Sequence, residues 1–413
     1  MKINRLFAII IAAAFCGVYA VAQNGTNTPY SRYGYGMLND NSTSTQRAMG
    51  GIGYAMSSGK QVNVKNPASY AAIDSLTFLF DMGADLSMQW SRENDLKENN
   101  LNGGLDYITM AFPITKRIGA SIGLLPFSST GYNFSDTMDN GATEHTGSGS
   151  LSELYVGAGI NPIADLYLGF NFAYLFGSLT NNVYAYTITG STSLFQRYIK
   201  VTDWRLDLGV QYPVRINRDS HLTLGLTFSP GKSFHGETYG LYYDATTNTQ
   251  VDTVGYTKLN GKNTMPATWG AGVNYEWRER LMVEADFTYQ PWKDVKYTAI
   301  EDFEKADFAN RWKVALGAQY TPNPRGSWSK RLQYRLGTYF NRDYIMVHDN
   351  KVREYGITAG LGLPITGFKS TLNIGFEFKH RQASPQALIK ENYFNITLGI
   401  NFNELWFRKS RIY

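Results

Sequence analysis

Four basic side chains in this sequence are placed to bind an anionic group. Arg205, Lys313, Arg335 and Lys379 each occupy a polar position in a segment whose alternate residues are apolar. A cation on such a face pairs strongly with a carboxylate, so these four are candidate binding groups for a carboxylate-bearing lipid. Acidic residues occupy similar positions, namely Asp81, Asp85, Asp207, Glu276, Glu284, Asp286 and Glu377. Ion pairs among these groups are therefore the favoured interpretation, and substrate binding stays open.

The sequence offers little for catalysis. His348-Asp349 is half of an acid–base pair, but no nucleophile can be assigned to it. Gly231-Lys232-Ser233 lacks the preceding glycine of a phosphate-binding loop, and no metal-ligand spacing occurs. The formal net charge of +5 is too small an excess to indicate a nucleic-acid partner. We expect no enzyme, no catalytic residue, no metal and no cofactor.

Residues 76–90 show the kind of element that would hold those side chains. Even positions, from Leu76 to Trp90, are apolar, and odd positions are polar or small except for Leu79. Successive side chains of a strand point to opposite faces, so this segment has one apolar and one polar face. At about 3.3 Å per residue and a tilt of about 45° it reaches roughly 30 Å in height, which crosses a bilayer.

The same two-residue alternation recurs along the chain. It is clear in residues 166–177, 204–212, 222–228, 269–277, 281–289, 312–320, 332–340, 355–363, 372–378 and 394–402. Short turns alternate with longer polar stretches, which include residues 135–150, 180–193 and 244–253. This arrangement is typical of outer-membrane barrels, and about fourteen strands fit within residues 74–404. Residues 183–189 and 234–243 either extend neighbouring strands or form separate ones.

Composition favours a membrane barrel over a soluble β-sandwich or propeller. Aromatic residues make up 15% of the 413 residues, charged residues only 18%, and there are 40 glycines. After residue 22 no apolar run approaches the roughly 20 residues that a membrane helix needs. A soluble sheet would not place large apolar side chains on the outward face of every strand. The expected fold is therefore all-β, a transmembrane antiparallel β-barrel.

Both ends of the chain differ from the alternating region. Residues 1–22 have the pattern of a signal peptide, with basic residues, an apolar stretch and a small-residue cleavage site. The only cysteine, Cys16, lies within it. Residues 23–73 are rich in small residues yet carry enough apolar ones to favour a plug, or hatch, in the periplasmic side of the barrel over a flexible leader. Residues 405–413 form a basic tail.

These features together resemble the FadL-type family of outer-membrane long-chain fatty-acid transporters. The resemblance is carried by Ser31-x-x-Gly34-x-Gly36, by Ala48-Met49-Gly50 and by Asn66-Pro67-Ala68 just before the first strand. It implies a location in the Gram-negative outer membrane and a hatch that contains Asn66, Pro67 and Ala68. It also implies passive uptake of hydrophobic small molecules such as long-chain fatty acids, by capture at the outer loops, passage past the hatch and lateral release.

A second function fits the same resemblance. Some FadL-like barrels act as shuttles or scaffolds in protein export, as in type IX secretion, and the partner would then be a protein at the outer loops or the C-terminal tail. A gap in the wall and an apolar pocket above the hatch would favour transport, whereas a closed lumen would favour the scaffold. Outer-membrane lipids are expected partners in either case.

Overall fold

The computed structural model describes residues 26–163, 165–244, 247, 249–259, 262–297, 307–365 and 369–405. The signal peptide expected at residues 1–22 lies outside the described residues, as does the basic tail beyond Leu405. Within the described part, no helix has the length and apolar character to cross a membrane.

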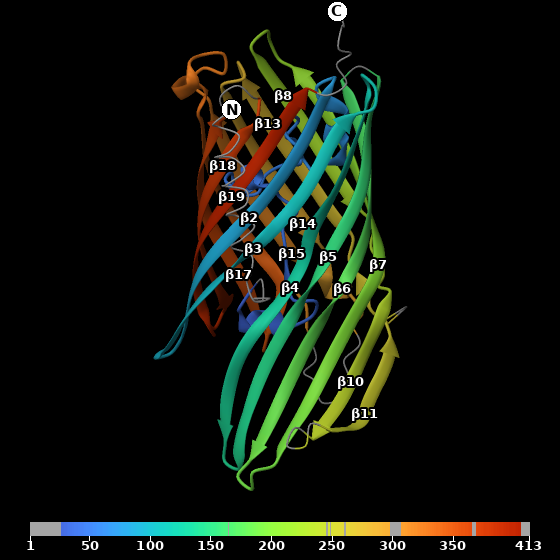
Figure 1. Cartoon of the computed structure of the whole chain (residues 1–413), viewed down its shortest axis with the longest axis vertical. Coiled ribbons are helices and arrows are strands. Elements are labelled where there is room, and N and C mark those ends of the chain that lie inside the picture. Colours follow the sequence, from blue (N-terminus) through green and yellow to red (C-terminus); the bar gives the residue numbers. More distant parts are fainter. Residues whose placement is uncertain are drawn as a thin grey trace, which may run out of the picture.

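The described chain forms a closed barrel of fourteen antiparallel strands, which confirms the fold expected from the alternation. The wall consists of β2 (Thr77–Glu93), β3 (Leu96–Pro113), β4 (Ile118–Met138), β5 (Gly141–Ile163), β6 (Leu166–Thr187), β7 (Thr192–Arg215), β8 (Ser220–Ser229), β13 (Thr268–Trp277), β14 (Leu281–Gln290), β15 (Arg311–Tyr320), β16 (Gln333–Val347), β17 (Asn350–Pro364), β18 (Thr371–Ser384) and β19 (Lys390–Leu405). β19 pairs with β2 and β8 pairs with β13, so the ring of strands closes (Figure 1).

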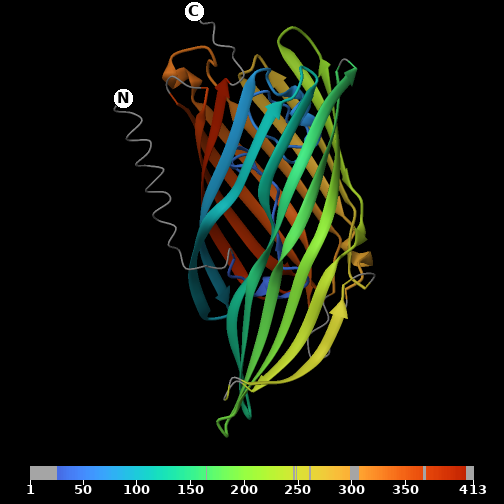
Figure 2. The ribbon, with the colours of Figure 1, turned by 45° about the vertical axis from the view of Figure 1, so that its right-hand side comes forward.

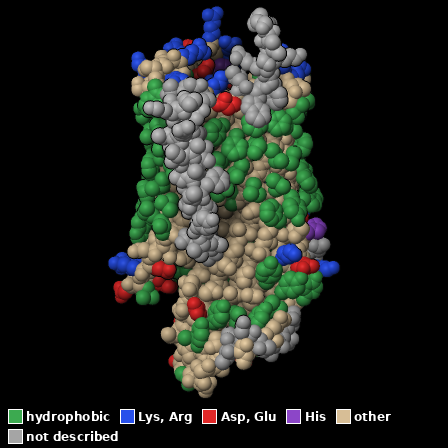
Figure 3. All heavy atoms as spheres, in the orientation of Figure 1, with side chains coloured by type: hydrophobic (Ala, Val, Ile, Leu, Met, Phe, Trp, Pro, Cys, Tyr) green, Lys and Arg blue, Asp and Glu red, His purple; other side chains and the backbone are tan. Residues whose placement is uncertain are grey.

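The alternation places apolar side chains outside and small or polar ones inside. Phe172 on β6 and Trp204 on β7 are 50% and 45% exposed, and their rings stack 6.0 Å apart on the outer wall. Their neighbours Asn171 and Asp203 face inward and are buried. The outer surface therefore carries the broad green band of hydrophobic side chains in Figure 3, as a bilayer-spanning wall requires.

Four strands continue well beyond the band. β4 to β7 have 21, 23, 22 and 24 residues, whereas about 9–11 suffice to cross a membrane. β10 (Gly236–Asp244) extends this sheet by pairing with β7, and β11 (Thr249–Lys258) pairs with β10. We call this projecting sheet the blade, defined as residues 128–150, 178–202, 236–244 and 249–258. It projects from the end of the barrel opposite the short turns (Figures 1 and 2), the end that faces outward in outer-membrane barrels.

The long polar loops expected at residues 135–150, 180–193 and 244–253 are a wrong prediction. Residues 135–138 and 141–150 continue β4 and β5, residues 180–187 belong to β6, and residues 249–253 belong to β11. Of the two segments left open by the sequence, residues 183–187 extend β6 and residues 236–243 belong to the separate strand β10. Outside the bilayer the outward face no longer needs apolar side chains, and positions such as Ser148, Ser150 and Thr180 are hydroxylic. The strands persist there, but the apolar half of the alternation disappears and the segments look like loops.

Residues 26–76 lie inside the barrel, and we call them the plug. They contain η1 (Pro29–Arg32), the short strand β1 (Met37–Leu38), α2 (Ser44–Arg47) and η2 (Pro67–Ala72). Thr28 and Asn66 cap the two 3-10 helices by accepting hydrogen bonds from Tyr30 N and Ala68 N. The blue ribbon of Figure 1 runs through the lumen in this region. Smaller elements, β9 (Lys232–Ser233), β12 (Thr264–Met265), η3 (Trp292–Asp294) and η4 (Trp328–Arg331), complete the described chain.

Candidate functional site

A ring of wall glycines receives the plug. A Cβ added at Gly169 would lie 2.3 Å from the Pro67 carbonyl carbon, and one at Gly337 would lie 2.2 Å from that of Met49. The ring, defined as the wall glycines whose added Cβ would meet plug atoms, comprises Gly119, Gly157, Gly159, Gly169, Gly209, Gly225, Gly270, Gly272, Gly317, Gly337, Gly360, Gly375 and Gly399. Many of them are cross-strand partners, such as Gly159 with Gly169 and Gly169 with Gly209. The plug backbone therefore approaches the wall at distances that only glycine permits.

Asn66, Pro67 and Ala68, the predicted hatch residues, lie against this ring and away from the lumen cavities. The Asn66 amide donates to the carbonyl oxygens of Tyr54 at 2.6 Å and Val210 at 3.1 Å, and its own oxygen accepts from Ala68 N. The side chain is buried and fully used in joining two parts of the plug to β7. Its contacts are those of a structural clamp.

Two wall carboxylates on β14 hold another part of the plug. Asp286 accepts from the backbone amides of Gly53 at 2.7 Å and Tyr54 at 3.1 Å, and Glu284 accepts from Ala55 N at 2.9 Å. Asn274 donates to the second Glu284 oxygen at 2.7 Å. Carboxylates bound to backbone amides form strong hydrogen bonds, so this site fixes residues 53–55 to the wall. The sequence placed both acids in the lumen but did not indicate this partner.

The lumen next to α2 contains a charged cavity of about 190 Å³. Its lining includes five basic and five acidic side chains, namely Arg47, Arg311, Lys313, Lys379 and Arg381, with Asp40, Asp85, Asp343, Glu354 and Glu377. Arg381 donates to Glu354 at 2.6 Å and 3.0 Å, and Lys379 lies 3.8 Å from the same carboxylate. These contacts are the ion-pair networks that the inward-facing charges of the sequence favoured.

Two of the four predicted lumen cations, Lys313 and Lys379, meet in this cavity. Lys313 pairs with Asp40 of the plug, and Lys65 lies 3.4 Å from the same carboxylate. Burial alone would raise the pKa of Asp40, but Lys313 and Lys65 outweigh it and hold that pKa below its usual value. Asp40 therefore stays charged at neutral pH and occupies both ammonium groups.

The other two predicted cations lie outside this cavity. Arg205 bonds Asp207 at 2.9 Å and Glu153 at 3.3 Å. Arg335 is almost fully buried and donates to the neutral oxygens of Gln319 at 2.8 Å and Asn373 at 2.7 Å, and also to Gln333. Neither side chain is available to a ligand in this arrangement.

The wall has an opening between β3 and β4. These strands share six residue pairs, from Ile108–Leu124 to Pro113–Gly119, whereas β2 and β3 share fifteen and β4 and β5 share twenty. From Leu124 toward the blade, the two strands separate around a cavity of about 310 Å³. Its lining includes Gly103, Gly104, Asp106, Pro126 and Ser128. The plug strand β1 pairs with the freed edge of β4, through Met37–Ser129 and Leu38–Ser128.

The sequence carries signals of this opening that the two-residue alternation does not reveal. Pro126 lacks the N–H that a wall strand would donate, and proline within a sheet is found at edges and bulges. The β4–β5 register shifts between Pro126 and Ser128. The pair Gly103-Gly104 weakens β3 on the other side of the same cavity. A proline in one strand and a double glycine in its neighbour are therefore signals of a break in the wall.

An ion pair stands where the lumen meets the opening. The two cavities share Asn39, Arg47, Asp85 and Ser129. Arg47, the last residue of α2, reaches across to Asp106 on β3 at 2.7 Å, and this carboxylate is only 6% exposed. Arg47 therefore lies at the boundary between the two cavities.

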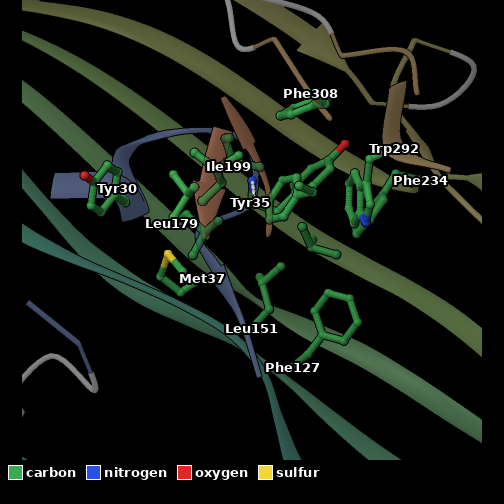
Figure 4. Packing of buried hydrophobic residues seen from close by; sticks show 14 of the residues in the cluster. Tyr30, Tyr35, Met37, Phe127, Leu151, Leu179, Ile199, Phe234, Trp292 and Phe308 are labelled. Atoms are coloured by element: carbon green, nitrogen blue, oxygen red, sulfur yellow. Dashed lines mark hydrogen bonds between the residues drawn. The ribbon is translucent and has the colours of Figure 1, made fainter. Parts of the chain in front are cut away.

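The outer end of the lumen is filled by a cluster of aromatic side chains around Tyr35 of the plug (Figure 4). The Tyr35 ring stacks on Phe234 at 4.7 Å and lies 6.2 Å from Trp292. Gly34 and Gly36 on either side have positive φ values of 61° and 79°, so the Gly34-x-Gly36 spacing turns the chain to insert this ring. The apolar side chains at this end of the lumen therefore pack against the plug.

The fold and these features define a class, the outer-membrane barrels of the FadL type. The toluene transporter TodX of P. putida is similar, with a TM-score of 0.60 and 13% identity over 90% of this chain and all of that one. The monoaromatic hydrocarbon channel CymD has a TM-score of 0.57 and 13% identity, covering 89% of this chain and 99% of that one. A FadL homologue of Pseudomonas aeruginosa has a TM-score of 0.59 and 10% identity, covering 90% and 100%.

Within this class the family is defined by sequence. The family model described as BamG matches residues 2–413, and the chain belongs to the BamG family. No curated protein matches. The similar structures are described as channels and transporters.

Proposed function

We propose that this protein is a Gram-negative outer-membrane channel, exported by a cleaved signal peptide at residues 1–22, that takes up hydrophobic compounds passively. The observation that carries the proposal is the opening between β3 and β4, which gives a solute in the lumen a sideways exit into the bilayer. A hydrophobic solute gains free energy on leaving water for the membrane, so lateral release needs no other energy source. The fold's similarity to hydrocarbon channels supports the same function.

The polarity of the passage favours amphiphilic substrates such as long-chain fatty acids over plain hydrocarbons. The cavity lining is rich in ions, and Arg47 lies between the lumen and the opening. A substrate carboxylate can replace Asp106 on the Arg47 guanidinium. In this mechanism capture occurs at the blade end, the plug shifts, and the substrate leaves through the wall. Lys313 and Lys379 are the further candidate binding groups, once released from Asp40 and Glu354.

Uptake of a labelled long-chain fatty acid tests the proposal. Cells with the gene should accumulate the label faster than cells without it. Tryptophan at Gly104 should bring the rate down to that of the deletion, because a side chain there enters the opening, where an added Cβ meets nothing within 4 Å. The matched variant Gly104→Ala, which leaves the opening free, should keep the wild-type rate. Equal rates with and without the gene would rule out transport of this substrate.

A second candidate function is a scaffold or shuttle for protein export, and the packing around Tyr35 favours it. The aromatic cluster closes the outer end of the lumen, as a protein that never passes small molecules would require. The blade then offers a surface for a protein partner, and the C-terminal tail is a further candidate contact outside the described residues. Loss of secreted proteins from the medium of gene-deleted cells, with unchanged fatty-acid uptake, would favour this function over transport.

A further inference from the structure

Three tyrosines, one exposed and two half-buried, cross the outward face of the blade beyond the lipid-facing band. Tyr198 on β7 pairs with Tyr239 on β10, and Tyr239 pairs with Tyr256 on β11. Their ring centroids are 6.3 Å and 5.0 Å apart, and Tyr256 is 48% exposed. Large aromatic side chains gathered outside both core and membrane mark a contact surface. We call these three residues, with Lys200, Glu237 and Lys258 beside them, the tyrosine face.

A row of charged side chains separates the tyrosines from the membrane. Glu237 on β10 lies opposite Lys200 on one side and Lys258 on the other. Glu237 accepts from the hydroxyl of Tyr239, and from that of Tyr256 at 3.3 Å. The Tyr239 hydroxyl lowers the pKa of Glu237, so the carboxylate is ionised at neutral pH and holds the rings in place. Figure 3 shows charged side chains gathered just below the green band on this side of the molecule.

The distance of the charged row and the tyrosines from the membrane identifies the layer in which they lie. Trp204 is the large lipid-facing ring on β7 nearest the blade. The Lys232 Nζ lies over it, 3.9 Å from the ring centroid, as expected at a membrane interface. Lys200 and Tyr198 lie four and six residues before Trp204 in the sequence, which at about 3.3 Å per residue and a tilt of about 45° is roughly 9 Å and 14 Å farther from the membrane. That layer holds the sugars attached to outer-leaflet glycolipids.

We propose that the tyrosine face binds the oligosaccharide of the outer-leaflet glycolipid. Sugar rings present C–H faces that pack against aromatic rings, whose faces carry partial negative charge. Their hydroxyls accept from Lys200 and Lys258 and donate to Glu237, and phosphate substituents would pair with the same lysines. The face looks sideways along the membrane, so a neighbouring glycolipid reaches it without leaving its leaflet. This inference rests on the outer-membrane location in the proposed function and does not depend on transport.

Binding of rough-type lipopolysaccharide, with its inner-core sugars, to the purified full-length protein in detergent tests the proposal. The variant Tyr198→Ser/Tyr239→Ser/Tyr256→Ser should bind it at least about tenfold more weakly than the wild type. Lipid A without core sugars should bind both proteins equally. The control Tyr212→Ser/Tyr320→Ser/Tyr334→Ser removes three exposed tyrosines from the periplasmic half and should keep wild-type binding of lipopolysaccharide.

Both variants should retain heat-modifiable mobility, which reports a folded barrel and separates lost binding from misfolding. Equal affinity of the wild type and the tyrosine-face variant for lipopolysaccharide would overturn the proposal. So would a photocrosslinker at Tyr256 that captures a protein in living cells and no glycolipid, since the face would then serve a protein partner.

Discussion

Replacing Gly169 with alanine is expected to loosen the plug from the wall. The added Cβ would lie 2.3 Å from the carbonyl carbon of Pro67 and 2.5 Å from Ala68 N, both backbone atoms inside the short helix η2. Neither atom can turn aside as a side chain would, so the helix must move inward and the Asn66 hydrogen bonds that fix it are strained. We expect a loss of about 1–3 kcal/mol in the free energy of unfolding.

Urea unfolding in detergent measures this loss, and trypsin reports where it occurs. The Lys65 side chain is 5% exposed in the native plug, so cleavage after Lys65 should accelerate in Gly169→Ala. Gly104→Ala is the matched control, because its Cβ meets nothing within 4 Å, and it should change stability by no more than about 0.5 kcal/mol. If both variants unfold alike and resist trypsin alike, the close approach of plug and wall is not what holds the plug.

A disulfide between the plug and the wall is expected to abolish fatty-acid uptake if the plug must shift. Ala48 follows α2, and a Cβ added at Gly375 on β18 would lie 3.6 Å from the Ala48 Cβ. Disulfides span Cβ atoms about 3.5–4.5 Å apart, so Ala48→Cys/Gly375→Cys should crosslink with little distortion. The only native cysteine, Cys16, lies in the expected signal peptide, so no other thiol competes in the mature chain.

The oxidised double variant should take up label at the rate of the gene deletion, and a membrane-permeant reductant should restore the wild-type rate. Each single cysteine variant, treated with the same oxidant, controls for the substitutions themselves. Unchanged uptake by a fully crosslinked protein would show that substrate passes a stationary plug. The mechanism would then reduce to a rearrangement at the wall, where Arg47 and Asp106 meet.

The sequence predicted the barrel because its physical cause is local. A strand that has lipid on one side and a filled lumen on the other must alternate apolar with small or polar residues, and the chain does so wherever it crosses the membrane. The prediction was wrong for the blade because water replaces lipid there. β4 to β7 continue with hydroxylic outward positions such as Ser148 and Thr180, which no longer distinguish a strand from a loop.

The candidate site was less accessible to prediction because it depends on register and on contacts distant in sequence. Alternation placed Lys313 and Arg335 on inward faces, but only the pairing of strands decides that Lys313 meets Asp40 while Arg335 meets amide oxygens. The sequence shows the wall glycines as small residues on the inward face of strands whose outward face is apolar. Their alignment into a ring against the plug requires the three-dimensional register of neighbouring strands.

The plug's contacts also constrain the order of assembly. Thr28, near the start of the described chain, donates to Glu391 on the last strand, a separation of 363 residues, and Ser44 lies against Gly399 on the same strand. The surface that receives the first part of the chain to be synthesised is therefore incomplete until the final strand joins β2. Such distant pairings fold slowly. The plug can complete its contacts with the wall only when β19 pairs with β2 and closes the barrel.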